Sequence, residues 1–107
     1  MTGPIPQPVV TLLDAANAND LDAFLAAFTA DGVVDDWGRE FHGADAIRGW
    51  SDGEFIGVEV SLAVTAVERQ GDETIVTAEV GGKGFNGPSH FAFRVEGERV
   101  ARMTIRA

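Results

Sequence analysis

The 107-residue sequence contains no cysteine and no tyrosine. The absence of cysteine excludes disulfide bonds, thiol chemistry and cysteine-ligated zinc or iron–sulfur centres. No segment approaches the roughly 18 consecutive apolar residues that a membrane-spanning helix needs. The first residues also lack the basic stretch followed by an apolar one that is typical of a secretion signal. We therefore expect a cytoplasmic protein that has no membrane partner.

Basic residues are scarce. The chain has eight Lys and Arg residues and 17 Asp and Glu residues, which gives a formal net charge of −9. This charge repels phosphate backbones and no basic cluster offsets it locally, so we expect no nucleic-acid partner. We favour solubility as the reason for the acidity over recruitment of a basic partner. The length and the 45% hydrophobic content predict a single domain over residues 1–107, with a proline-rich arm over residues 1–8.

Apolar residues recur with helical spacing in the N-terminal third. A first helix, beginning after Pro8, is predicted from Val9, Leu12, Leu13 and Ala16. A second is predicted from Leu21, Phe24, Leu25 and Phe28, and Asp31-Gly32 should end it. Ile47 and Trp50 share one face of a third, short helix over 44–51, which Asp52-Gly53 should stop.

From Phe55 onward the spacing of apolar residues changes to the alternation of β-strands. The first long strand should bury a face made of Val58, Val60, Leu62, Val64 and Ala66. Strands over 74–80, around Phe91 and Phe93, and over 100–105 should follow, separated by glycine-containing turns. Helices followed by hairpins predict an α+β fold in which three N-terminal helices pack on a curved sheet around an apolar cavity.

Several phrases of the sequence are similar to those of a known superfamily. They are Asn19-Asp20-Leu21, FTADGVVDDWG over 28–38, FHGADAIRGW over 41–50, and FAFRVEGERV over 91–100. With the order of elements, they make nearly the whole chain resemble the nuclear transport factor 2-like superfamily, in particular SnoaL-like domains and, more distantly, ketosteroid isomerases. The resemblance implies a cone-shaped α+β barrel with a curved antiparallel or mixed sheet and an internal pocket. The superfamily includes isomerases, cyclases, dehydratases and transport factors, so it does not imply one reaction.

Asp35 and Asp36 are the main catalytic candidates. Adjacent strand residues point to opposite faces, so one carboxylate should face the cone interior, although the sequence does not decide which. Asp36 matches the general-base aspartate of the ketosteroid isomerases, which implies that it could take a proton from a carbon next to a carbonyl and return it. The alternative is a pair of solvated turn carboxylates before Gly38.

The resemblance to ketosteroid isomerases is incomplete. The tyrosine that donates a hydrogen bond to the substrate oxygen in those enzymes would fall at Leu12, and the second donor, an aspartate, near Phe91. Donors aimed at the developing negative charge supply a large share of such catalysis. We therefore do not expect ketosteroid isomerase activity.

His42 is the second catalytic candidate, because a histidine in the pocket could act near neutral pH. The alternative is a structural histidine at the start of the third helix. His90 should lie on the outer sheet face, opposite to Phe91. Neither histidine has a companion ligand at a recognised spacing, so we expect no metal site, and we expect no cofactor.

Aromatic residues should line the pocket, where they would suit a small apolar ligand. The candidates are Trp37, Trp50, Phe55, Phe85 and Phe28. Simple core packing is the alternative for each of them.

Three arginines alternate with apolar residues on the last two strands, so Arg94, Arg102 and Arg106 should lie on the outer sheet face. In the superfamily that face commonly packs against a second subunit. We expect a homodimer through the sheet face, with ion pairs to Glu59 or Glu79 as the alternative role of the arginines.

Two functions follow from these observations. In the first, a SnoaL-like isomerase or cyclase uses Asp36, with His42, for proton transfer on a small apolar carbonyl compound in the internal pocket. In the second, the domain is a non-catalytic small-ligand-binding or dimerisation module. The missing donor residues favour the second function, and an acidic group at the pocket wall favours the first.

Overall fold

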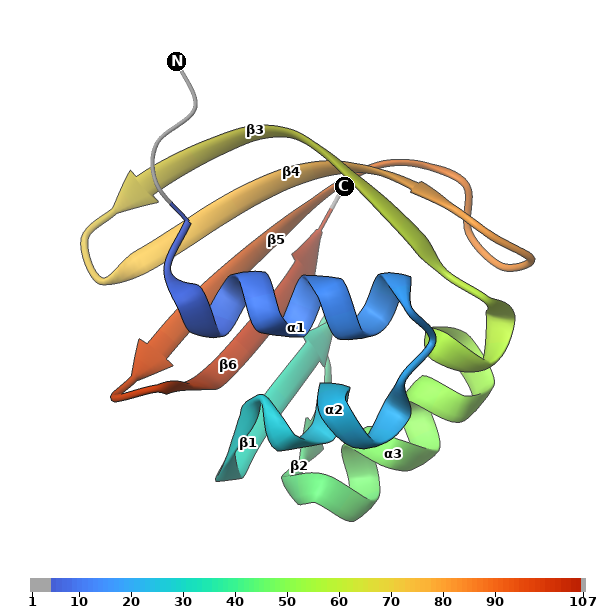
Figure 1. The fold of residues 1–107 in the computed structure, drawn as a ribbon, viewed down its shortest axis with the longest axis horizontal. Coiled ribbons are helices and arrows are strands. Elements are labelled where there is room, and N and C mark those ends of the chain that lie inside the picture. Colours follow the sequence, from blue (N-terminus) through green and yellow to red (C-terminus); the bar gives the residue numbers. More distant parts are fainter. Residues whose placement is uncertain (1–4, 107) are drawn as a thin grey trace.

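A computed structural model describes residues 5–106 (Figure 1). Its helices are α1 (Gln7–Asn17), α2 (Leu21–Ala26), α3 (Gly43–Glu54) and the short 3₁₀ helix η1 (Ile56–Val58). Its strands are β1 (Phe28–Asp36), β2 (Arg39–His42), β3 (Ser61–Gln70), β4 (Glu73–Gly81), β5 (Gly87–Glu96) and β6 (Arg99–Arg106).

The six strands form one curved sheet in the order β2-β1-β6-β5-β4-β3. Strands β1 and β6 run parallel, whereas the other neighbouring pairs are antiparallel. Helix α1 lies across the concave side of the sheet, and α2 and α3 lie beside it at the β1 end (Figure 1). The predicted α+β fold, with three helices on a curved mixed sheet, is confirmed.

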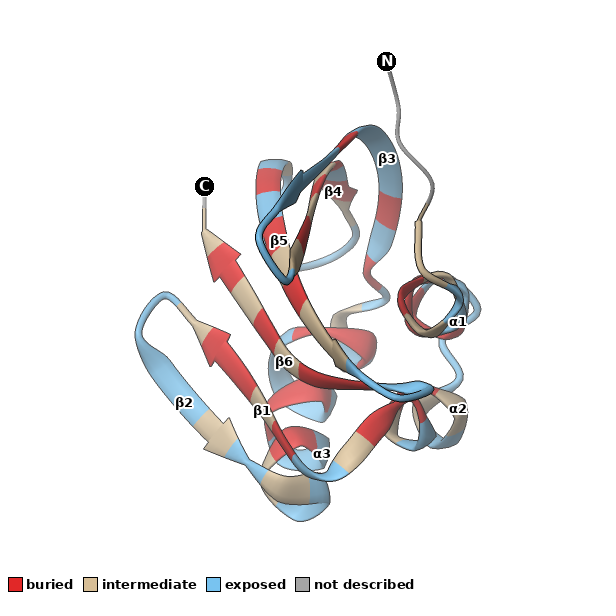
Figure 2. Cartoon of the chain, turned by 90° about the vertical axis from the view of Figure 1, so that its left-hand side faces the viewer, coloured by how far each residue is buried: buried red, intermediate tan, exposed pale blue. Residues whose placement is uncertain are grey.

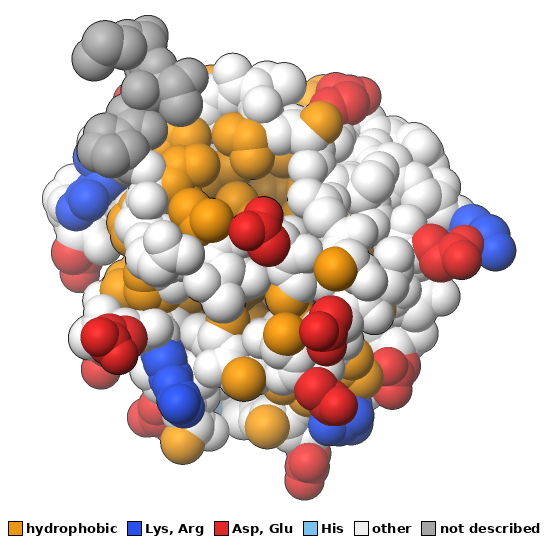
Figure 3. Space-filling model, viewed as in Figure 1, with side chains coloured by type: hydrophobic (Ala, Val, Ile, Leu, Met, Phe, Trp, Pro, Cys, Tyr) orange, Lys and Arg blue, Asp and Glu red, His pale blue; other side chains and the backbone are white. Residues whose placement is uncertain are grey.

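The core lies between α1 and the concave face of the sheet. Buried and exposed residues alternate along the strands, as Figure 2 shows. The predicted apolar stripe of the first helix is buried at Val9, Leu12, Leu13 and Ala16. Larger side chains with almost no exposed surface complete the core, among them Phe24, Ile47, Phe91, Phe93 and Met103. Figure 3 also shows a hollow between α1 and the β3–β4 hairpin, which hydrophobic side chains line.

The second helix is shorter than predicted. Helix α2 ends at Ala26, and Phe28 is already the first residue of β1. The backbone N–H of Val100 donates to the Ala27 carbonyl at 2.8 Å, and Phe28 pairs with Val100 across the parallel strands. The prediction that Asp31-Gly32 ends a helix is therefore wrong, because pairing with a distant strand overrides the local helical pattern.

The third helix is longer than predicted, and the first long strand begins later. Helix α3 continues through Asp52-Gly53 to Glu54, and η1 occupies residues predicted as strand. A side chain on Gly57 would place its Cβ 1.5 Å from the Asp52 carbonyl oxygen, so glycine allows η1 to pack directly on α3. This packing delays the start of β3 to Ser61.

A β-bulge changes the buried face of β3. Val64 pairs with Ala78 and Ala66 pairs with Thr77, so Thr65 is an extra residue in the strand. Val64, before the bulge, is 40% exposed, and Val67, after it, is buried. The predicted buried face is therefore right for Val60 and Leu62 and wrong for Val64 and Ala66.

Residues 5–8 do not form the predicted N-terminal arm, because helix α1 begins at Gln7 and Ile5 packs against the core. Residues 1–4 of the predicted arm lie outside the described residues. No helix within residues 5–106 is long and apolar enough to cross a membrane.

Candidate functional site

A cavity of about 390 Å³ opens between α3, η1, the β4–β5 loop and the concave face of the sheet. This volume falls within the range of small-molecule pockets. Aromatic rings dominate its wall, namely Trp37, Trp50, Phe55, Phe85 and Phe91. Trp50 and Phe55 are buried and stack with their ring centres 4.9 Å apart, whereas Trp37 and Phe85 are 61% and 59% exposed. The cavity therefore has a packed aromatic floor and two exposed rings among its walls.

Asp36 supplies a carboxylate to this aromatic wall. It lies at the end of β1, where it pairs with Ile105 of β6 and with Arg39 of β2. Its side chain is 16% exposed. The structure therefore places Asp36, and not Asp35, on the cavity side of the sheet.

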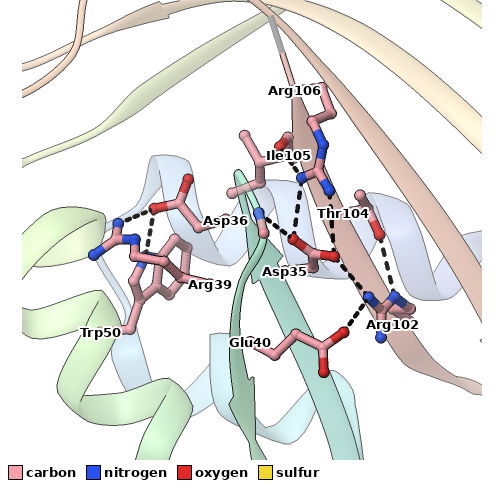
Figure 4. Close-up of polar contacts among 10 residues, drawn as sticks. Asp35, Asp36, Arg39, Glu40, Trp50, Arg102, Thr104, Ile105 and Arg106 are labelled. Atoms are coloured by element: carbon pink, nitrogen blue, oxygen red, sulfur yellow. Dashed lines mark hydrogen bonds and ion pairs between the residues drawn. The ribbon is translucent and has the colours of Figure 1, made fainter.

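The two carboxylate oxygens of Asp36 have different surroundings (Figure 4). Oδ2 accepts from Trp50 Nε1 at 3.1 Å and from Arg39 Nη2 at 2.6 Å. Within residues 5–106, no hydrogen bond to Oδ1 is found. The carboxylate is thus oriented through one oxygen, and the other is free to accept a hydrogen bond or a proton from a ligand.

Arg39 links Asp36 to a second carboxylate on the cavity wall. Its guanidinium donates to both oxygens of Glu54, at 3.0 Å and 2.7 Å, as well as to Asp36. The arginine lowers the pKa of Glu54, and the two carboxylates raise the pKa of Arg39. Two carboxylates and one guanidinium leave this side of the cavity with one net negative charge.

Asp35 lies on the opposite face of the sheet, in a separate ion-pair network (Figure 4). Its carboxylate accepts from Arg106 at 3.0 Å, from Arg102 at 2.7 Å and from the backbone N–H of Gly38 at 2.7 Å. Arg102 also donates to Glu40 at 2.9 Å. Arg106 is the main cause of a lowered pKa of Asp35, and burial of the side chain opposes it.

The turn after Asp36 has an unusual backbone. Trp37 and Gly38 both have positive φ, 56° and 90°, as in the tight turns that join antiparallel strands. A tryptophan in this region is uncommon and costs on the order of 1 kcal/mol or more. The hydrogen bond from Gly38 to Asp35 holds the turn, and the turn places the Trp37 indole against the cavity.

The structure brings together five of the seven predicted site residues. Asp36, Trp37, Trp50, Phe55 and Phe85 all line the cavity. His42 does not, because its side chain is 64% exposed and its Nε2 lies 3.0 Å from Glu40 Oε1 on β2. Phe28 does not either, because it packs edge-on against Phe24 with ring centres 5.3 Å apart. The placement of His42 and Phe28 in the pocket is therefore corrected.

The outer-face arginines also differ from the expected ion pairs. Arg102 and Arg106 bind Asp35, and Arg94 binds Glu96 at 2.9 Å. Glu59, one expected partner, pairs instead with Lys83. His90 is exposed and Phe91 is buried, as the predicted alternation of the strand requires. Within residues 5–106, no three His, Asp or Glu side chains converge in a way that could hold a metal ion.

Sequence reasoning missed three polar residues of the cavity wall, Arg39, Glu54 and Ser89. Arg39 follows Asp36 by three residues across a tight turn, so pairing of the two strands could have revealed it. Ser89 precedes Phe91 by two residues and shares its face. No sequence pattern placed Glu54 at the cavity, because the helix that positions it was predicted to end before this residue.

Comparisons with known proteins agree with this fold. The family model described as "SnoaL-like domain" matches residues 9–103. A crystal structure of a Sinorhizobium meliloti protein proposed to be a polyketide cyclase has a TM-score of 0.83 and 28% identity, over 95% of each chain. No curated protein matches the chain.

A second solved structure has a ketosteroid isomerase-like fold and comes from Catenulispora acidiphila. It has a TM-score of 0.79 and 26% identity, over 97% of this chain and 87% of that one, and was solved in complex with trimethylamine. An NTF2-like protein of unknown function from Cytophaga hutchinsonii, 10% identical, has a TM-score of 0.79 over 99% of this chain and 93% of that one. This last likeness concerns the fold alone.

The network around Asp35 predicts a pH-dependent stability. The folded pKa of Asp35 lies below its ordinary value of 3.8, so the ionised carboxylate stabilises the fold above about pH 4, and this contribution is lost as the pH falls further. Asp35→Asn should lower the free energy of unfolding by about 1–3 kcal/mol at pH 7, because it leaves two arginines without their shared partner.

Urea unfolding at pH 7 and at pH 3 measures this effect. The difference between wild type and Asp35→Asn should shrink at pH 3. Glu40→Gln is the matched control, because Glu40 is 44% exposed and solvent screens its pair with Arg102, so this variant should cost less than Asp35→Asn. Equal costs for the two variants, or a difference that does not depend on pH, would contradict the assignment.

Proposed function

The chain belongs to the SnoaL-like domain family, and from that membership we propose that its cavity binds a small apolar carbonyl compound on which Asp36 transfers a proton. The observation that carries this proposal is the state of the Asp36 carboxylate: Oδ2 is held by Trp50 and Arg39, and Oδ1 has no partner among the described residues. A base fixed through one oxygen is oriented before the ligand arrives, which lowers the cost of reaching the reactive geometry.

The proposed step is an isomerase- or cyclase-type proton transfer. Asp36 Oδ1 removes a proton from the carbon next to the ligand carbonyl, and the electrons of that C–H bond form a carbon–carbon double bond as the carbonyl electrons move to oxygen. The carboxylic acid then returns the proton to the same carbon or to another one. A ligand seated against the buried rings of Trp50, Phe55 and Phe91 loses water on that side, which strengthens the electrostatic interactions made there.

A second candidate function is ligand binding without chemistry. It is favoured by the ion pair of Asp36 with Arg39 at 2.6 Å, which already engages one oxygen of the carboxylate that the first function uses as a base. The Catenulispora acidiphila protein of similar fold was solved in complex with trimethylamine, which supports the binding of a small molecule. One assay distinguishes the two functions, because binding and proton transfer are measured separately.

Exchange of α-protons tests the proton transfer. The bicyclic ketone 2-tetralone is a suitable probe, since it is small and apolar and its α-protons are acidic. In D₂O, wild-type protein should accelerate the loss of the α-proton NMR signal above the rate without protein. Asp36→Asn should lower the protein-dependent rate by about 100-fold or more, because general-base catalysis is worth that much.

The matched control is Asp31→Asn, which removes an exposed carboxylate of the same strand at a distance from the cavity. It should leave the exchange rate unchanged. Melting temperatures of both variants should stay close to that of the wild type. Tight binding of 2-tetralone without accelerated exchange would favour the binding module, and an unchanged rate in Asp36→Asn would remove Asp36 from the mechanism.

We also propose that two copies of the chain associate through the outer face of the sheet. Thr104, Ala92 and Ile75 are neighbours across β6, β5 and β4, and their side chains form an uncharged strip on that face. All three are partly exposed. Charged residues flank this strip, with Asp35 at its β1 end and Glu68 at its β3 end. An uncharged centre with a polar rim is the usual arrangement of a protein interface.

Sedimentation at micromolar concentration tests the dimer. Wild type should sediment as a dimer, and Ile75→Arg should shift it toward the monomer, because the substitution places a charge at the centre of the proposed interface. Ala44→Arg, on the exposed surface of α3, is the control and should remain a dimer. A monomeric wild type would rule out the proposal.

A further inference from the structure

Ser89 is a polar residue of the cavity wall that the proposed proton transfer does not yet use. It lies on β5, two residues before Phe91 and on the same face of the strand, and it is only 4% exposed. Its neighbours on the wall are predominantly apolar, including Val60, Val80 and Phe91. A hydroxyl in such surroundings normally has a hydrogen-bond partner.

No partner for the Ser89 hydroxyl is found within the described part of the chain. The residue borders the cavity. A ligand in that space can therefore accept a hydrogen bond from the Ser89 hydroxyl.

From this geometry we infer that Ser89 is the hydrogen-bond donor for the carbonyl oxygen of the ligand, opposite to the base Asp36. The inference rests on the proposed function, and it adds the residue that would bind the carbonyl oxygen of the ligand. It also answers the lack of donors at Leu12 and Phe91, because an oxygen that gains negative charge needs a donor in a dry site.

The positions of the two residues on the sheet fit this assignment. Asp36, Ile105 and Phe91 form one row across β1, β6 and β5, and Ser89 lies one side-chain position further along β5 on the same face. Strand spacings place the Cα atoms of Asp36 and Ser89 about 12 Å apart. A ketone whose α-proton meets Asp36 and whose oxygen meets Ser89 can bridge at most about 8 Å between the two side-chain oxygens. The concave curvature of the sheet brings the tips of inward side chains closer together than their Cα atoms, which shortens the span toward that length.

The aromatic wall sets the class of ligand. Asp36 as acceptor and Ser89 as donor face a cavity whose remaining wall consists mainly of rings and aliphatic side chains, together with the Arg39–Glu54 ion pair. They match a compact cyclic ketone with its reactive carbon next to the carbonyl. A ligand with a carboxylate near Asp36 would be disfavoured by the net negative charge of the Asp36–Arg39–Glu54 group.

Infrared spectroscopy of bound 2-tetralone, labelled with ¹³C at the carbonyl, tests the hydrogen bond directly. A donor lowers the carbonyl stretching frequency. We expect a lowered frequency in the wild type, its loss in Ser89→Ala, and its retention in Asp36→Asn. Ser61→Ala is the matched control, because this serine lies outside the cavity wall and is exposed. The exchange rate of bound ketone should fall by about 10- to 100-fold in Ser89→Ala, with a smaller change in affinity.

A thiol at the same position provides a second measurement. The chain has no cysteine, so Ser89→Cys introduces the single reactive thiol of the protein. A small methanethiosulfonate reagent should modify it, and 2-tetralone should slow that reaction. The isosteric variant leaves no void, and its weak S–H donor should lower the carbonyl frequency less than the hydroxyl does.

The outcomes separate the two proposals. A lowered frequency that depends on Ser89, without accelerated exchange, supports the donor and overturns proton transfer. Accelerated exchange with a frequency that does not change in Ser89→Ala overturns the donor and leaves Asp36 as the base. A wild-type protein that does not bind 2-tetralone would overturn both the ketone pocket and the role assigned to Ser89.

Discussion

The candidate site depends on the alternation of side chains at the end of β1. Asp35 and Asp36 are adjacent, so strand geometry sends them to opposite faces of the sheet. The outer face offers Asp35 two arginines and the N–H of Gly38, whereas the inner face offers Asp36 the Trp50 indole and Arg39. Because each carboxylate has partners on its own side, exchanging the two faces would break both sets of contacts.

This arrangement connects stability with the shape of the cavity. The ion pairs of Asp35 join β1 to β6, the strand beside it in the sheet. The hydrogen bond that Asp35 accepts from Gly38 holds the turn that carries Trp37. The same turn brings Arg39 back beside Asp36. The outer network is therefore a support for the inner one, and residues that never contact a ligand determine where the ligand-facing carboxylate lies.

Much of this could be read from the sequence, where the causes are local. The helical stripe of α1 and the order of elements follow from spacing, the opposite faces of Asp35 and Asp36 follow from strand alternation, and the choice of Asp36 follows from the family resemblance. The failures have non-local causes. Phe28 belongs to a strand because Val100 pairs with it, Val67 replaces Ala66 in the core because of a bulge at Thr65, and His42 turns outward to Glu40. Glu54 and Ser89 join the cavity through packing that no local pattern records.

Both tryptophans of the chain line the cavity, which makes their indole N–H resonances direct reporters of the site. Titration with 2-tetralone, followed by ¹H–¹⁵N NMR of the two indole groups, tests whether a small apolar ketone binds beside Asp36. Both resonances should shift and saturate together, and the Trp50 signal should respond through its bond to Asp36. Backbone shifts confined to other surfaces, with both indole signals unmoved at saturation, would contradict binding at this site.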